Sequence, residues 1–370
     1  MAVLVTPLQR RTTRIPAPAS RPGRIAVLDG LRLVAALMVV GYHFVAYDRG
    51  TVPPWGAAAE RVFPWLSVPA SYGWIGVPMF FVISGFVICL SAWDRTPAQF
   101  LRSRVVRLFP AYWAAALLTF AVLSLWPVVR RPVGPSDLLV NLTMLQNPMG
   151  VRPADAVYWT LWVEARFYLL FALVVWRGLT VRSATLFGFG WLVAAALAEQ
   201  ADVDALDVVV MPENAPYFVA GIALFLVHRT GGHLTLWALF GASFLMAQHY
   251  VAAQVGHVAQ DVLGRPIPVL PALVLVTAVF ATMAVVATGR LSRVRWRWLT
   301  VAGALTYPLY LLHEYIGWTL IAALHPVLPR YVTLAIVVTV VMVAAWLLHR
   351  YVERPTARLL RERLSRPLPR

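Results

Sequence analysis

The chain has 370 residues, and with 60% hydrophobic but only 13% charged residues it lacks the polar surface that soluble domains need, which points to the bilayer as its solvent. The net charge is +16 and all 32 basic residues are arginine, but long apolar runs separate them, so we expect membrane topology and no nucleic-acid partner. Cys89 is the only cysteine, which excludes a disulfide scaffold and a cysteine-rich zinc site.

The two ends of the chain are basic. Residues 1–24 are rich in Arg and Pro and predict a flexible cytoplasmic arm on anionic lipid, without the apolar core and cleavage site of a signal peptide. Residues 25–350 predict a single membrane domain. Residues 351–370 predict a basic cytoplasmic tail with a short amphipathic helix.

Ten segments are apolar enough to be spans, since a bilayer core needs roughly 20 apolar residues per helix. They begin near Val27, Trp74, Leu108, Tyr158, Ala184, Tyr217, Leu234, Val269, Trp298 and Tyr331. The fold class we predict is all-α, a polytopic bundle of about ten transmembrane helices. Most arginines fall in the segments on one side, which predicts that both termini are cytoplasmic and that the protein is a multi-pass plasma-membrane protein.

The first span, LDGLRLVAALMVVGYHF, carries Asp29, Arg32 and His43. Eleven residues are close to three helical turns, so Arg32 and His43 share one face, separated by roughly 16 Å along the axis. A cation at the inner edge and an imidazole deeper in suit an anionic ligand that enters from the cytosol. The alternative is that Arg32 snorkels to headgroups and His43 caps the outer end. Asp29 is expected as the helix N-cap.

Five segments in this order resemble the motifs of the acyltransferase-3 family of integral membrane O-acyltransferases. The first is the Arg–His span. The others are GVPMFFVISGFVI, FLRSRVVRLFPAYW with its Arg-x-x-Arg loop at Arg104 and Arg107, YWTLWVEARFYLLF with Glu164, and LTYPLYLLHE with His313. A closing VERP follows. The chain departs from the family pattern at Pro78, where Asp is usual, and at Ala165-Arg166, where Glu-Gln is usual. These variants are similar to the branch that acylates macrolide sugars and other glycosylated metabolites.

The resemblance implies an enzyme that transfers an acyl group from acyl-CoA, used as a co-substrate, to a hydroxyl of a sugar on a glycan or a glycosylated small molecule. His43 is then the general base, since an imidazole titrates near neutral pH. Acylation of the imidazole itself is the alternative. Arg32, Arg104 and Arg107 would hold the phosphates of CoA. Without the family, Arg104 and Arg107 are explained by the positive-inside rule alone.

Glu164 and Tyr168 lie one helical turn apart on one face. With the family in view, Glu164 orients an imidazole or contacts the acceptor hydroxyl; alternatively it forms a structural ion pair, for which Arg166, two residues on, is poorly placed. His313 and Glu314 are expected on the acceptor side. Ser84, in ISGF, is interpreted as a close-packing residue.

The remaining histidines lack metal-ligand spacing, so we expect no metal site and no permanently bound cofactor. Trp65 and Trp74, beside predicted span ends, are interpreted as membrane-interface anchors. A transporter or flippase of a lipid-linked or anionic substrate is the alternative function, because it too would have many spans and intramembrane charges. Turnover of acyl-CoA distinguishes the two.

Overall fold

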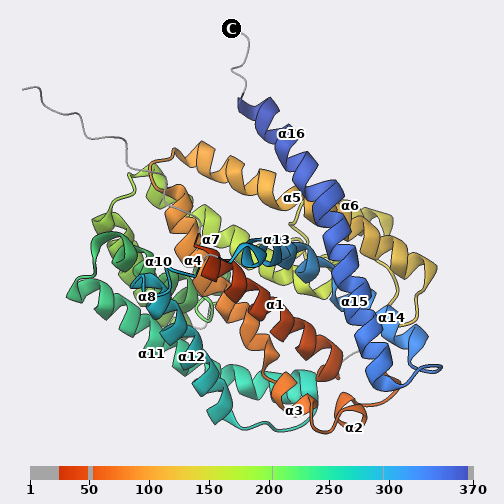
Figure 1. Cartoon of the computed structure of the whole chain (residues 1–370). Coiled ribbons are helices and arrows are strands. Elements are labelled where there is room, and N and C mark those ends of the chain that lie inside the picture. The colour runs from red at the N-terminus through yellow and green to blue at the C-terminus, as the bar shows by residue number, and fades with distance from the viewer. Residues whose placement is uncertain (1–24, 49–52, 202, 295, 366–370) are drawn as a thin grey trace, which may run out of the picture.

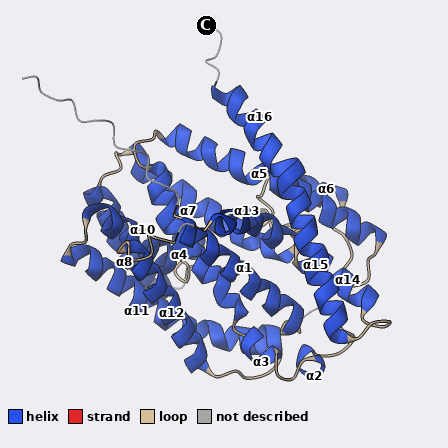
Figure 2. Cartoon of the chain, in the orientation of Figure 1, coloured by secondary structure: helices blue, strands red, loops and turns tan. Residues whose placement is uncertain are grey.

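The computed structural model describes residues 25–48, 53–201, 203–294 and 296–365. Within these residues every regular element is a helix and no strand occurs (Figure 2). The prediction of an all-α fold is confirmed. The predicted basic arm, residues 1–24, and the last part of the predicted tail, residues 366–370, lie outside the described ranges.

The helices of the first half run from the first span to the middle of the chain. They are α1 (Ala26–Val45), α2 (Ala59–Val62), α3 (Ser67–Ala70), η1 (Gly73–Ile75), α4 (Gly76–Ala92), α5 (Pro97–Leu125), α6 (Pro135–Leu142), η2 (Ala156–Tyr158) and α7 (Trp159–Trp176).

The helices of the second half include two π-helical turns, η3 and η4. They are α8 (Val181–Ala201), α9 (Asp204–Val210), α10 (Ala215–Thr230), α11 (Leu234–His257), η3 (Val258–Leu263), α12 (Val269–Ala287), α13 (Arg297–Leu312), α14 (Glu314–Leu324), α15 (Arg330–Leu348), η4 (His349–Glu353) and α16 (Arg354–Ser365).

Nine helical segments of the described chain are long and apolar enough to cross a membrane. They match the predicted spans except the ninth, where the structure has two shorter apolar helices, α13 and α14. These two continue each other through His313, whose N–H bonds Leu309 O and whose carbonyl accepts from Gly317 N–H. The chain is therefore a multi-pass membrane protein, and its ninth predicted span is a pair of shorter helices that meet at His313.

The third predicted span begins earlier than expected. We expected a start near Leu108, with Arg104 and Arg107 in a preceding loop, but α5 begins at Pro97 and contains both arginines. Thr96 and Gln99 form a capping box, and Pro97 occupies the first helical position, where its missing N–H costs nothing. These start signals place the arginines on a rigid helix.

The first half of the core is built around α4 and α10. Every residue of α10 from Ala215 to Val227 is buried, as expected for a helix that is apolar on all sides. Gly85 and Gly221 face each other where the two helices meet, and a Cβ on either would collide with the other helix's backbone. Small residues permit this close approach, as in many membrane bundles.

The second half of the core gathers α1, α5, α13, α14 and α15 (Figure 1). Helices α1 and α13 approach closely at Asp29 and Gly303. The expectation that Asp29 is the N-cap was wrong: the N-cap is Ile25, and Asp29 lies inside the first turns with 4% of its surface exposed. The buried Asp29 carboxylate lies close to an arginine of the same helix, since Asp29 Oδ1 is 4.0 Å from Arg32 Nη1.

The two ends of the bundle are distinct. In Figure 1, α2 and α3, which follow the end of α1, lie at the bottom, and α16 extends beyond α15 at the top. Because α1 runs from Arg32 towards His43, these residues lie at different depths in the bundle.

Candidate active site

His43 lies in the last turn of α1, with its ring nitrogens in different surroundings. Its Nδ1 is 3.0 Å from Val39 O and 3.0 Å from Nε2 of His313. His313 is fully buried, and its own Nδ1 is 2.8 Å from Tyr310 O. Since a carbonyl oxygen only accepts, both Nδ1 atoms must donate. The network therefore assigns the lone pair of His43 to Nε2.

The free nitrogen of His43 faces a carboxylate. Glu314 Oε2 lies 3.9 Å from His43 Nε2 and has no hydrogen-bond partner within the described part of the chain, although only 1% of Glu314 is exposed. At this distance there is no hydrogen bond. The carboxylate can instead stabilise an imidazolium once Nε2 has taken up a proton.

Asp155, just before η2, supports Glu314. It hydrogen-bonds the Glu314 carboxyl and accepts backbone N–H groups from Val157 and Tyr315. Burial raises the pKa of the Asp155 carboxyl. A hydrogen bond between two carboxyls requires that one of them carries the proton, which leaves the other able to hold the negative charge of the pair.

His43 and Glu314 line a cavity of about 640 Å³ at the end of the bundle where α1 finishes, which we call the outer cavity. Its volume is within the range of small-molecule pockets. Trp74 lines it as well, a contact that its interpretation as a membrane-interface anchor did not include, whereas Trp65 is 88% exposed. The cavity therefore places open space beside the side chains of His43 and Glu314.

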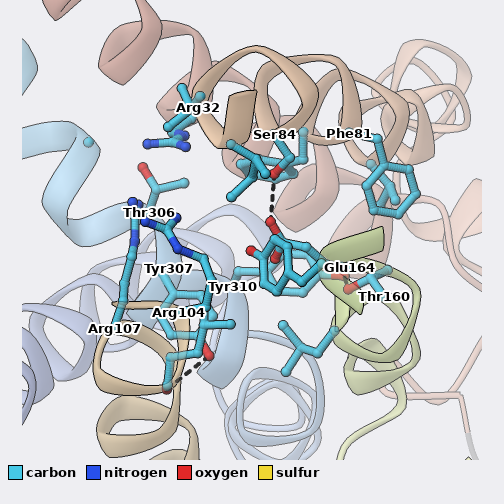
Figure 3. Close-up of a pocket in the computed structure, with 18 residues that line it drawn as sticks. Arg32, Phe81, Ser84, Arg104, Arg107, Thr160, Glu164, Thr306, Tyr307 and Tyr310 are labelled. Atoms are coloured by element: carbon cyan, nitrogen blue, oxygen red, sulfur yellow. Dashed lines mark hydrogen bonds between the residues drawn. The ribbon is translucent and has the colours of Figure 1, made fainter. Parts of the chain in front are cut away.

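A second, narrower cavity of about 100 Å³ lies towards the start of α1, and we call it the inner cavity. Arg32, Arg104 and Arg107 line it and gather on one side in Figure 3. Arg104 is 9% exposed and its Nε donates to Ser103 Oγ at 3.2 Å. A buried arginine turned into a cavity is not explained by topology alone.

Glu164 and Tyr168 also line the inner cavity. Ser84 donates its hydroxyl hydrogen bond to Glu164 Oε1 at 2.6 Å (Figure 3), and Tyr168 hydrogen-bonds the same side chain. Glu164 therefore lies with the arginines and outside the cavity that His43 lines. Ser84 makes this contact next to the close-packed Gly85, so the packing interpretation of Ser84 covered only part of its environment.

The two cavities have Val77 and Tyr310 in common. Arg32 and His43 thus share one face of α1 but line different cavities, separated by this pair of side chains. Arg166 takes part in neither: its Nη1 donates to Val208 O and its guanidinium lies 5.5 Å from the Trp162 ring.

Glu314 and Asp155 had no assigned catalytic role in the sequence reasoning. Glu314 directly follows the motif histidine His313, which is the one local signal that could have drawn attention to it. Asp155 lies in a loop 159 positions from Glu314 in the sequence, and only the packing of η2 on α14 unites them.

Comparison with known proteins gives consistent results. The model of a family described as an acyltransferase domain matches residues 25–350. "Acyltransferase MdmB" of Streptomyces mycarofaciens is 27% identical over 381 residues, covering 92% of this chain and 93% of that protein. "O-acetyltransferase OatA" of Staphylococcus aureus is 28% identical over 185 residues, covering 45% of this chain and 26% of that longer protein. No solved structure matches.

Proposed function

This chain belongs to the acyltransferase-3 family, and from that membership we propose that it is a membrane O-acyltransferase which moves an acyl group from acyl-CoA to a hydroxyl of a sugar-containing acceptor. The observation that carries the proposal is the state of His43. Its Nδ1–H is engaged by Val39 O and His313, while Nε2 lies 3.9 Å from Glu314 Oε2, and both His43 and Glu314 line the outer cavity.

The reaction step follows from this geometry. The acceptor hydroxyl in the outer cavity gives its proton to His43 Nε2, and its oxygen attacks the thioester carbonyl carbon. The new ester C–O bond forms, the C–S bond breaks, and the proton passes from His43 to the departing CoA thiolate. Glu314 interacts with the imidazolium more strongly than with neutral imidazole, so it favours the transition state over the ground state.

The inner cavity suits the donor. Coenzyme A carries several phosphate charges, and arginine offers a planar fork of donors for phosphate. Arg32, Arg104 and Arg107 would hold the nucleotide end while the narrow cavity takes the linear arm, with the thioester reaching between Val77 and Tyr310. We assign Glu164, with Tyr168 and Ser84, to this donor side as well, and Asp29 to holding Arg32.

The acceptor approaches from the opposite end, through the outer cavity. With both termini cytoplasmic, the arginines face the cytosol, where acyl-CoA is available, and His43 is reached from outside. The protein then passes an acyl group across the plasma membrane without moving either substrate through it.

The donor assignment is tested by calorimetric titration of CoA into the full-length protein in detergent. Arg104→Gln and Arg32→Ala should each weaken binding by about tenfold, the loss of about 1.4 kcal/mol from a charge-assisted contact. Arg102→Gln is the matched control, since Arg102 is exposed on the same helix and lines neither cavity. Unchanged CoA affinity in Arg32→Ala and Arg104→Gln would refute the donor site.

The histidine role is tested in the same samples. His43→Ala should keep CoA binding and lose acyl transfer by about 10²–10⁴-fold, the usual contribution of a general base. Rapid-quench trapping of an acyl-protein would favour an acyl-histidine relay over direct transfer. If CoA does not bind a folded protein, and flux of a lipid-linked sugar occurs without acyl-CoA turnover, the flippase reading replaces this one.

A further inference from the structure

The outer cavity differs in charge from the rest of this basic molecule. No arginine lines it within the described residues, whereas three carboxyl groups do: Glu213, Asp261 and Glu314. Glu213 and Asp261 are exposed at its mouth, and Glu314 is buried beside His43. Of the described side chains that line it, only His43 and His257 can carry positive charge. An acidic cavity in a chain of net charge +16 requires a reason.

Four polar atoms in the lining of this cavity have no hydrogen-bond partner among the residues that the structure describes. They are Trp74 Nε1, Tyr217 Oη, Gln254 Oε1 and Glu314 Oε2. Tyr217 and Glu314 are each only 1% exposed. Buried polar groups are normally paired, so unpaired ones gathered in one cavity point to a polar ligand. Gln254 Oε1 and Glu314 Oε2 can only accept, so they call for a ligand rich in donors.

Aromatic side chains also line the outer cavity. Tyr42, Tyr47, Trp74, Trp159 and Tyr217 all contribute to the cavity surface. Aromatic faces pack against the apolar faces of sugar rings and attract cations. The same surface therefore suits a sugar and an attached ammonium group.

The carboxyl groups are not arranged to hold a metal ion. Among the residues that the structure describes, no group of three or more His, Cys, Asp or Glu side chains could bind one. Gln254 Nε2 donates to Glu213 Oε2 at 3.3 Å, and His257 Nδ1 lies 3.9 Å from Asp261 Oδ2, so each carboxylate at the mouth has a different neighbouring side chain. Carboxylates that do not converge on one point suit an organic cation with several hydrogen-bond donors better than a metal ion.

We propose that the outer cavity selects an acceptor that carries a protonated amine, that is, a small molecule bearing an amino sugar. The proposal rests on the proposed function and names its acceptor class. The ammonium group lies between Glu213 and Asp261 at the mouth, the sugar ring packs on the aromatic side chains, and the hydroxyl to be acylated reaches His43 Nε2.

The experiment compares three methyl glycosides of the same size: the 2-amino-2-deoxyglucoside, which is cationic at neutral pH, the neutral glucoside and the anionic glucuronide. Each is titrated into the full-length protein in nanodiscs, and each is offered as acceptor with radiolabelled acetyl-CoA. The cationic probe should bind about tenfold more tightly than the neutral one, the size expected of one or two partly exposed charge contacts and a cation–π contact. The anionic probe should bind more weakly than the neutral one.

The double variant Glu213→Gln with Asp261→Asn should remove this preference and leave affinity for the neutral glucoside unchanged. Asp204→Asn with Asp207→Asn is the matched control, because it removes the same two charges from exposed positions on α9 that do not line the cavity. The control should keep the preference. An equal loss in both double variants would mean that only the general surface potential attracts the cation, which would overturn the proposal.

The readouts separate this inference from the proposed function. CoA binding and release of CoA from acetyl-CoA are measured in the same samples. If CoA binds but the cationic probe binds no better than the neutral one, or does not bind, the acceptor inference fails and the acyltransferase proposal stands. If CoA does not bind to folded protein while the cationic probe does, the acyltransferase proposal fails and the cation preference of the outer cavity stands.

Discussion

The His43 ring is held by one carbonyl, Val39 O, and by the imidazole of His313, and this chain of hydrogen bonds gives His313 a testable role. His313→Ala removes one of the two acceptors for His43 Nδ1–H, the other being Val39 O, without removing the base. We expect kcat to fall by about tenfold, the value of one hydrogen bond of about 1.4 kcal/mol, with the affinity for CoA unchanged. Steady-state kinetics with acetyl-CoA measures this split between kcat and KM.

A conservative variant shows whether His313 affects kcat by orienting the His43 ring. His313→Gln places an amide oxygen near the position of Nε2 and should restore much of the lost kcat. If Ala and Gln at this position behave alike, His313 does not act through the orientation of His43.

Glu314 is predicted to act on the charge of His43 during the reaction. Glu314→Gln keeps the size of the side chain and removes the ionisable carboxyl 3.9 Å from Nε2, so that the negative charge of the carboxyl pair is confined to Asp155. We expect kcat to fall by a factor on the order of 10², because the imidazolium loses the counter-charge that Glu314 can supply. Glu353→Gln is the matched control: Glu353 also pairs with a histidine, His349, at 2.8 Å, but lies outside both cavities. A normal kcat in Glu314→Gln would remove Glu314 from the mechanism.

At this scale the sequence located the side chains but not their partners. Arg32 and His43 could be related to each other because one helix fixes their spacing. His43 and His313 are 270 positions apart, and their contact depends on how α1 packs against α13. Glu164 and Glu314 are both carboxylates in apolar helices, so local sequence could not say which one lies beside the imidazole. Only the tertiary packing distinguishes them.

Among the elements, the contact between α4 and α10 gives a prediction about stability. Gly221→Ala would place a methyl group against Val82 O and Phe86 N of the facing helix. We expect a loss of about 1–3 kcal/mol, the usual cost of overpacking, seen as a lower unfolding temperature in detergent. Gly241→Ala is the control, because nothing lies within 4 Å of a Cβ there. That change should be neutral or stabilise α11 by up to about 1 kcal/mol. Equal effects at both positions would contradict a packing role for Gly221.

The helices themselves were predictable because each span requires a long apolar run, and such runs are visible in the sequence. The residues at which the helices begin and end could not be predicted in the same way. The start of α5 depends on the cap at Thr96 and Pro97, upstream of the apolar run that marked the span at Leu108. The division of the ninth span at His313 leaves no break in hydropathy, since α13 and α14 are both apolar.

At the scale of the whole molecule, the two cavities differ in charge as their proposed ligands require. The inner cavity has three arginines and one glutamate, and the outer cavity has three carboxyl groups and no arginine within the described residues. Val77 and Tyr310 line both cavities, so the acyl carbon would have to pass only this pair of side chains to reach His43.

This arrangement works only if the two ends of the bundle face different compartments, which gives the last prediction. Cys89 is fully buried, so single cysteines can be introduced at exposed positions without interference from it. Trp65→Cys lies in the segment after α1, and Leu359→Cys lies on α16 at the opposite end. A membrane-impermeant maleimide should label Trp65→Cys in intact cells and Leu359→Cys only after permeabilisation, because the arginine-rich side is retained in the cytosol. The reverse pattern would place the arginines outside, away from cytosolic acyl-CoA, and the inner cavity could not then be the donor site.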